Sequence, residues 1–288
     1  MKRTALLTLL LATSNVQAVE VLATIKPLEM IVHELIVDGD STSTLLHGNA
    51  SPHDYALKPS DLTRLKEADL VVWFGEDLET FLVKPISRLN TAVTLQEQES
   101  IELREFGKKC GCGAHHSSHD PHVWLGPKQA RQIAKVITEK LIELNPTHAA
   151  SYKAKLMQFN FNMTKTVDQI QGQLAPFKQE GYFVFHDAYG YFEDYFNTNK
   201  LGHFTVEPER KPGAKTLIKI KTTIRDKNVK CVFTEPQFTP AVIESTVRGT
   251  NAKIGQLDPL GVDIEVADRS YFRFLQSISK NLTNCLAN

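Results

Sequence analysis

Short apolar segments alternate with amphipathic ones along this chain, which is the pattern of a parallel α/β protein. A continuous apolar run at residues 70–74 ends at Gly75, and such runs are typical of strands buried on both faces of a sheet. Regular alternation of strands with helices predicts βαβ units. In the first part of the chain we predict strands at 19–25, 41–46 and 70–74, and helices at 28–37 and 59–68, the second with Ser60 as its N-cap.

The same pattern returns after residue 180. Here we predict strands at 182–185, 202–206, 231–234 and 253–257. The predicted helices are 189–196, 214–227, 240–248 and 270–281.

A different segment separates these two parts. Apolar residues recur there every three or four positions, which predicts one amphipathic helix: Leu156, Phe159, Met163, Val167, Ile170 and Leu174. At 1.5 Å per residue it would be roughly 40 Å long. The alternative is two short helices with a break near 160–162. We therefore predict two parallel-sheet α/β lobes, residues 19–145 and 177–288, joined by one long linking helix at 146–176.

The first eighteen residues have the organisation of a secretory signal peptide. Lys2 and Arg3 precede an apolar run at 5–12, and Val16-Gln17-Ala18 offers small residues for cleavage. No Cys follows the cleavage site to carry a lipid anchor, so we expect the periplasm as the compartment.

Composition and charge indicate a globular protein and argue against a nucleic-acid-binding one. Hydrophobic residues make up 42% and charged residues 23% of the 288 residues, and the formal net charge is zero. These are values of an ordinary globular protein. A nucleic-acid-binding protein would show a basic surface, so no nucleic acid is expected as a partner.

Four Cys allow three disulfide pairings. Cys110 and Cys112 stand together in a polar segment, while Cys231 and Cys285 lie in the last quarter of the chain. We predict a Cys231–Cys285 disulfide that ties the C-terminal segment to a strand, with a gain of about 3–5 kcal/mol in stability.

Three His follow or precede predicted elements in a similar way. His53 comes after a strand, His186 ends a strand, and His122 precedes a helix. Ligands in open α/β sheets bind beyond the carboxyl ends of strands, so these side chains could meet in a cleft between the lobes. Three imidazoles suit Zn²⁺. Asp258, at the end of another predicted strand, or water would be the fourth ligand.

Longer motifs add a family resemblance. The sequence resembles the ZnuA-type periplasmic zinc-binding components of high-affinity ABC uptake transporters, within the wider family of zinc and manganese solute-binding proteins. The matching segments cover nearly all of the chain after residue 18, and they are residues 53–61, 68–73, 122–125, 182–192, 202–206, 235–238 and 257–261. The resemblance implies metal held between two lobes, with His53, His122 and His186 as ligands.

The resemblance also bears on the choice of metal. Manganese-type members tend to have a carboxylate in place of the third His, so His186 favours zinc, which imidazole suits better. Some zinc members have Glu immediately before the first His, whereas this chain has Pro52. That departure leaves the fourth position to Asp258, which we favour, or to water.

A short loop at 108–119 carries a second group of potential ligands. It contains His115, His116 and His119 together with Cys110 and Cys112. One interpretation is a second, weaker metal site that collects or delivers zinc. The alternative is a disordered tether whose two Cys form a local disulfide.

The predicted function is a monomeric periplasmic protein that binds Zn²⁺ and delivers it to an ABC-transporter membrane permease. It would not be an enzyme. The alternatives are a manganese-binding homologue, an adhesin-like or storage protein, and a zinc hydrolase with Glu235 or Asp187 as general base. The helix motif His-Glu-x-x-His of zinc proteases is absent from the sequence.

Overall fold

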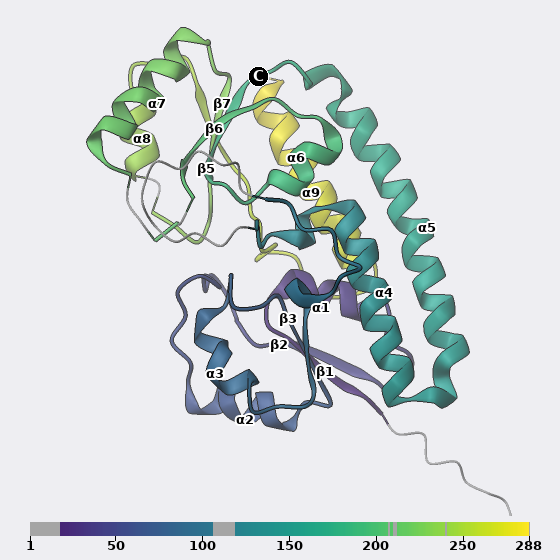
Figure 1. The fold of residues 1–288 in the computed structure, drawn as a ribbon. Helices are drawn as coiled ribbons and strands as arrows, with labels where there is room; N and C mark the ends of the chain where they lie inside the picture. The colour runs from purple at the N-terminus through teal and green to yellow at the C-terminus, as the bar shows by residue number, and fades with distance from the viewer. Residues whose placement is uncertain (1–17, 106–118, 207, 210–211, 240, 288) are drawn as a thin grey trace, which may run out of the picture.

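The computed structural model describes residues 18–105, 119–206, 208–209, 212–239 and 241–287. It contains two four-stranded parallel sheets, each covered by helices, with a long helix along the side of both (Figure 1). The predicted fold class is confirmed. Apart from Ala18, the predicted signal peptide lies outside the described residues.

The first sheet has the strand order β2-β1-β3-β4, and all of its pairs are parallel. Its strands are β1 (Glu20–Ala23), β2 (Ser41–Thr44), β3 (Leu70–Trp73) and β4 (Ala92–Thr94). Its helices are α1 (Lys26–His33), α2 (Pro59–Glu67), α3 (Val83–Ile86) and α4 (Pro127–Leu144). The three-residue strand β4 is too short to show a period in the sequence.

The second sheet repeats this topology with the order β6-β5-β7-β8. Its strands are β5 (Tyr182–His186), β6 (Lys200–Thr205), β7 (Cys231–Thr234) and β8 (Lys253–Gln256). Its helices are α6 (Gly190–Phe196), α7 (Ala214–Asp226) and α8 (Ala241–Val247). All residues of β5 and β7 are buried. The same holds for β3, for which the apolar run at 70–74 predicted burial.

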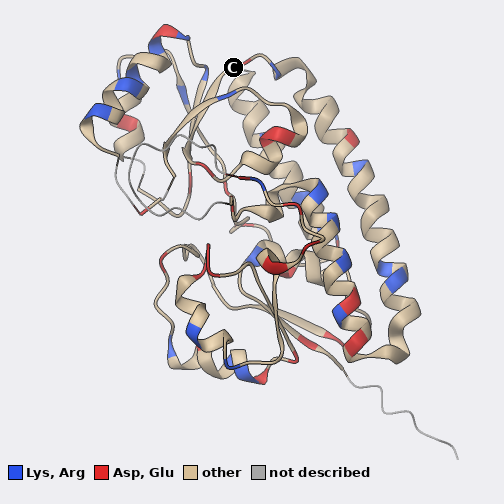
Figure 2. Cartoon of the chain, in the orientation of Figure 1, with Lys and Arg blue, Asp and Glu red and all other residues tan. Residues whose placement is uncertain are grey.

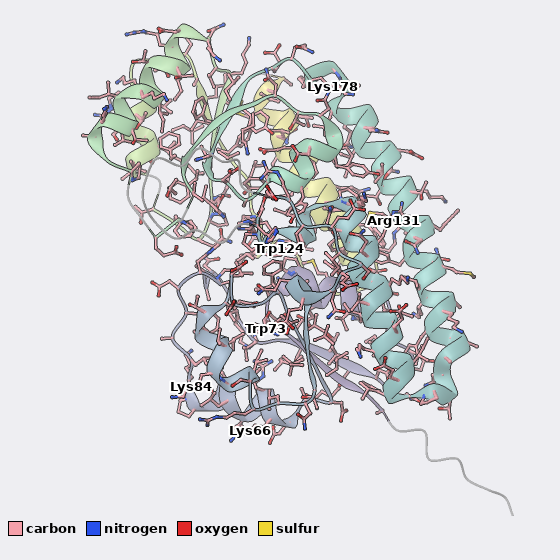
Figure 3. The ribbon with its side chains drawn as sticks, in the orientation of Figure 1. Lys66, Trp73, Lys84, Trp124, Arg131 and Lys178 are labelled. Carbon is pink, nitrogen blue, oxygen red and sulfur yellow. A yellow bond between two sulfur atoms is a disulfide. The ribbon has the colours of Figure 1, made fainter. Side chains whose placement is uncertain are left out.

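The linking helix α5 is continuous over Ala149–Leu174, so the alternative of a break near 160–162 is wrong. Its apolar stripe is buried against α4 and α9. At the suggested break, Arg131 of α4 donates a hydrogen bond of 2.7 Å to the Asn160 carbonyl oxygen (Arg131 is labelled in Figure 3). That bond holds the two long helices together where the polar residues interrupt the stripe.

The C-terminal helix α9 (Ser270–Leu286) is longer than predicted and contacts α5, α1 and β8. Helix α9 therefore contacts both lobes, α1 in the first and β8 in the second, and its last turn lies on the second sheet (Figure 1). The predicted Cys231–Cys285 disulfide is confirmed, with Cα atoms 6.1 Å apart, and it joins β7 to α9. Cys110 and Cys112 lie outside the described residues.

The prediction that Ser60 caps α2 is wrong. The helix begins one residue earlier, with Pro59 in its first turn and Lys58 at the N-cap position. Proline suits this place because it has no N–H to satisfy and its φ is already helical. The Asp61 carboxylate accepts the Lys58 N–H at 2.8 Å and so takes over the capping role.

Basic and acidic residues occur on both lobes and on the linking helix (Figure 2). This distribution agrees with the formal net charge of zero. None of the helices in the described ranges is long and apolar enough to cross a membrane.

Candidate metal centre

Three His side chains from distant parts of the sequence converge between the two sheets. His53 lies on the connection from β2 to α2, His122 immediately precedes a 3-10 turn at Val123–Leu125, and His186 is the last residue of β5. One potential ligand atom from each lies within 4.8 Å of the others. Their ring centroids are 5.0–5.7 Å apart.

The closest pair of ligand atoms has the spacing of a metal site. His122 Nε2 and His186 Nε2 are 3.1 Å apart. Two imidazole nitrogens bound to one tetrahedral Zn²⁺ at about 2.0–2.1 Å would be roughly 3.3 Å apart. The two rings are therefore already close to a zinc-binding arrangement.

Each of these two rings is oriented by a carboxylate. His122 Nδ1 lies 2.8 Å from Asp120 Oδ1, and His186 Nδ1 lies 2.7 Å from Glu235 Oε2. These contacts assign the proton to Nδ1 and leave an unprotonated Nε2 facing the site. Two nitrogen lone pairs 3.1 Å apart repel each other unless a cation lies between them. The pair is therefore arranged for a metal ion or a shared proton.

The sheet topology explains the pairing of His186 with Glu235. The chain leaves β5 toward β6 on one side, while β7 lies on the other side of β5. His186 ends β5 and Glu235 directly follows β7, so the two side chains stand at the point where the strand order reverses. Ligands of open α/β sheets bind at such points. Glu235 thus orients the His186 ring through this hydrogen bond.

The carboxylate beside His122 is held by a further network. Arg104 Nη1 donates to Asp120 Oδ2 at 3.1 Å and Arg104 Nε donates to Asp194 of α6 at 2.8 Å. The hydroxyl of Tyr191 donates to the Asp120 carbonyl oxygen at 2.8 Å. Sequence reasoning missed Asp120 and Arg104, and the signal for the former was its place two residues before His122.

Burial and charge set the protonation of the three rings. Burial, with repulsion from neighbouring His, holds the pKa of His53 and of His122 well below 6.5. Burial also opposes a charge on His186, but attraction to Glu235 outweighs it and raises the pKa of His186. Burial raises the pKa of Asp120 to about 7, although Arg104 opposes this shift. Neutral imidazole is the form that binds metal.

The space between the rings suits a single ion. The cavity has a volume of about 10 Å³, which is near the room that one water molecule needs. Its walls include Trp124, whose indole N–H donates to the Pro259 carbonyl oxygen at 2.7 Å. Figure 3 shows Trp124 between the two lobes.

Asp258 does not join the three His. Its Oδ1 accepts hydrogen bonds from the Gln237 amide at 2.9 Å and from the Leu260 N–H at 3.0 Å, and its Oδ2 accepts from the Val262 N–H at 2.5 Å. In this conformation the carboxylate shapes the loop that follows β8. Its predicted role as the fourth ligand stays a prediction.

The predicted second site lies mostly outside the described residues, which exclude His115 and His116. His119 is described and forms an isolated antiparallel bridge with Glu105. Glu105 and His119, the described residues on either side of 106–118, are thus paired next to Asp120.

Comparison with known proteins agrees with this geometry. Residues 21–285 match the family model for the periplasmic zinc-uptake complex component A, ZnuA. The chain is 40% identical to the high-affinity zinc uptake system protein ZnuA of Yersinia pestis, covering 94% of this chain and 92% of the relative. It is 38% identical to the protein of that name from Haemophilus ducreyi, covering 99% of both.

Solved structures show a similar fold. A crystal structure of ZnuA superposes with a TM-score of 0.81 at 25% identity, covering 94% of this chain and all of that chain. The laminin-binding protein of Streptococcus agalactiae, at 22% identity and a TM-score of 0.80, shares the fold. From the extent of the family match and the identity to its members, the chain belongs to the ZnuA family of periplasmic zinc-uptake components.

Proposed function

We propose that this protein captures Zn²⁺ between its two lobes in the periplasm and delivers it to an ABC-type membrane permease. The observation that carries the proposal is the pair of carboxylate-oriented Nε2 atoms 3.1 Å apart, with His53 completing a group of three. Zinc is the cargo of this site. Family membership supports the transport role and the permease as partner.

Zinc rather than manganese is the proposed metal because all three convergent ligands are imidazoles. Nitrogen ligands of this kind suit Zn²⁺, whereas oxygen-rich sites suit Mn²⁺. We propose Asp258 as the fourth ligand, which would require its carboxylate to exchange hydrogen bonds with Gln237 for the ion. Water is the alternative.

Capture and release, rather than catalysis, fits the surroundings of the site. The two acidic residues considered as a general base are both engaged: Glu235 with His186, and Asp187 with Lys200 at 2.5 Å. A cavity of about 10 Å³ between the three rings has the size of a single ion, which supports binding of an ion more than binding of a peptide or ester. Turnover of an ester substrate by the zinc form would contradict the proposal.

Three further features belong to the same proposal. The protein acts as a monomer with one lobe at residues 19–145 and another at 177–288. The loop at 108–119 provides a second, weaker zinc site through His115, His116 and His119. The Cys231–Cys285 disulfide suits an oxidising compartment such as the periplasm.

The test is metal content and competition binding on the chain without residues 1–18. We expect one tightly bound Zn²⁺ that excess Mn²⁺ does not displace. Substitution of His53, His122 or His186 by Ala should each weaken binding strongly, while Ala at the exposed His47 should not. Zinc binding that is indifferent to all three substitutions, or a preference for manganese, would overturn the proposal. Deletion of 108–119 should remove only a second, weaker event in calorimetry.

A further inference from the structure

The three convergent His are not held in the same way. His122 and His186 are buried and hydrogen-bonded to carboxylates through Nδ1. His53 is partly exposed, and in the part of the chain that the structure describes no hydrogen bond to its ring is found. Among the ring–ring contacts of the described residues, the His53 ring meets the other two His rings. The position of His53 therefore depends on its backbone.

That backbone is held by one side chain. The Ser51 hydroxyl accepts a hydrogen bond from the His53 N–H at 3.3 Å. The same hydroxyl donates its proton to Glu209 Oε1 at 3.0 Å. A serine hydroxyl has one proton to give and two lone pairs to accept with, so it can make both bonds at once.

The second of these bonds crosses between the lobes. Ser51 lies on the β2–α2 connection of the first lobe, while Glu209 lies on the β6–α7 connection of the second. Desolvation raises the pKa of Glu209, and hydrogen bonds from its own backbone and from the Ser51 hydroxyl, followed by attraction to His186, partly oppose that shift. The Glu209 carboxylate thus lies within electrostatic reach of the site that the lobes enclose.

Ser51 and its neighbour Pro52 also form part of the wall of the cavity between the three His. A movement of this segment away from the second lobe would carry His53 with it and open the cavity. It would leave His122 and His186 in place, since their carboxylate partners belong to other segments.

We propose that the Ser51–Glu209 hydrogen bond is a latch between the lobes that positions His53 and slows the release of zinc. Glu209 is a positioning residue in this arrangement and does not bind the ion. The inference rests on the proposed zinc-binding function. It identifies His53 as the ligand that leaves first when the latch opens.

The test is the rate of zinc transfer to an excess of chromophoric chelator, followed by stopped flow on the full mature chain. Glu209→Ala and Ser51→Ala should each accelerate release by roughly three- to tenfold, the effect of losing one solvent-exposed hydrogen bond. The double variant should release zinc no faster than Ser51→Ala. Glu209→Gln retains an oxygen that accepts from Ser51 and should restore a rate close to that of the unmodified protein. Glu244→Ala, at an exposed position of α8, is the matched control.

Each result decides between the latch and an alternative. Unchanged release rates in both Ala variants, with one zinc still bound, would overturn the latch and leave the proposed function intact. Release by Glu209→Gln as fast as by Glu209→Ala would also overturn it, because the negative charge would then act on the ion itself. Additive effects in the double variant would show that the two residues act separately. Failure of the unmodified chain to bind zinc would instead overturn the proposed function.

Discussion

His186 and Glu235, 49 residues apart in the sequence, lie at the ends of adjacent parallel strands with Nδ1 and Oε2 2.7 Å apart. The contact is buried, and Tyr189 donates a further hydrogen bond of 3.2 Å to the other carboxylate oxygen. A carboxylate in this position fixes the ring and makes its free nitrogen a better ligand.

Loss of this carboxylate should weaken zinc binding. We expect Glu235→Gln to lower zinc affinity about tenfold and Glu235→Ala up to about a hundredfold, the range found for partners of metal-bound His. Chelator competition at pH 7.5 would measure the change, with Glu265→Gln at an exposed position as control. An unchanged affinity in Glu235→Ala would mean that ring orientation does not limit binding.

The same pair should set the pH at which zinc is lost. The pKa of His186 is raised, because attraction to Glu235 outweighs burial, so its proton competes with zinc at a higher pH than an ordinary His proton would. Affinity should fall as pH decreases through that raised pKa. In Glu235→Gln the loss of zinc should begin at a lower pH than in the unmodified protein, although the zinc affinity at neutral pH is weaker. Identical onsets in both proteins would contradict this explanation.

Asp258 gives a separate test of the fourth ligand. If it binds the ion, Asp258→Ala should weaken zinc binding and remove one oxygen from the first coordination shell seen by X-ray absorption spectroscopy. Unchanged affinity and coordination number would assign the fourth position to water. Asp263→Ala, at an exposed position of the same loop, is the matched control.

Glu79 should make the stability of the fold depend on pH. Its side chain is fully buried, and burial raises its pKa from 4.5 to about 7 despite hydrogen bonds from the Phe74 and Gly75 N–H groups. The folded state therefore holds this proton more tightly than the unfolded state does. Its contribution to stability is complete below about pH 4.5 and is lost as pH rises through about 7, a change on the order of 3 kcal/mol.

Glu79→Gln should abolish this part of the pH dependence because glutamine does not titrate there. Urea unfolding of both proteins at several pH values would measure this. Between pH 5 and pH 8 the free energy of unfolding of the variant should rise relative to that of the parent protein. A difference in the free energy of unfolding that stays constant with pH would contradict the assignment.

The disulfide should contribute strongly to stability. Cys231 and Cys285 close a loop of 54 residues, for which chain entropy gives about 4 kcal/mol. We expect Cys285→Ser to lower the free energy of unfolding by about that amount and to leave zinc stoichiometry unchanged. Calorimetric melting with and without zinc would check both points.

The sequence was informative where one segment determines its own structure. Buried strands such as β3 and β5 and the stripe of α5 follow from apolar periodicity, so their predictions held to within a few residues. The N-cap of α2 was missed because Ser60 fits a general preference, whereas Pro59 and Asp61 together fix the helix start. Local sequence does not show which of two suitable residues caps the helix.

The candidate metal site was harder to predict from the sequence than the helices and strands. His53, His122 and His186 were chosen as candidate ligands from their places beside predicted strands and helices and from a family resemblance, because no fixed spacing relates them. The contacts of Arg104 with Asp120 and of Ser51 with Glu209 join segments that only the tertiary fold brings together. The hydrogen bonds that occupy Asp258 were invisible for the same reason.

The continuous helix α5, together with helix α9, which contacts both lobes, has a consequence for recognition by a membrane partner. Two stiff rods run past the junction of the lobes, and bending either would break backbone hydrogen bonds along its length. Loaded and empty molecules should therefore have nearly the same outline in solution scattering. A permease that distinguishes loaded from empty protein would then have to recognise small local changes beside the site, where Ser51 and Glu209 are hydrogen-bonded. It could not rely on a change in overall shape.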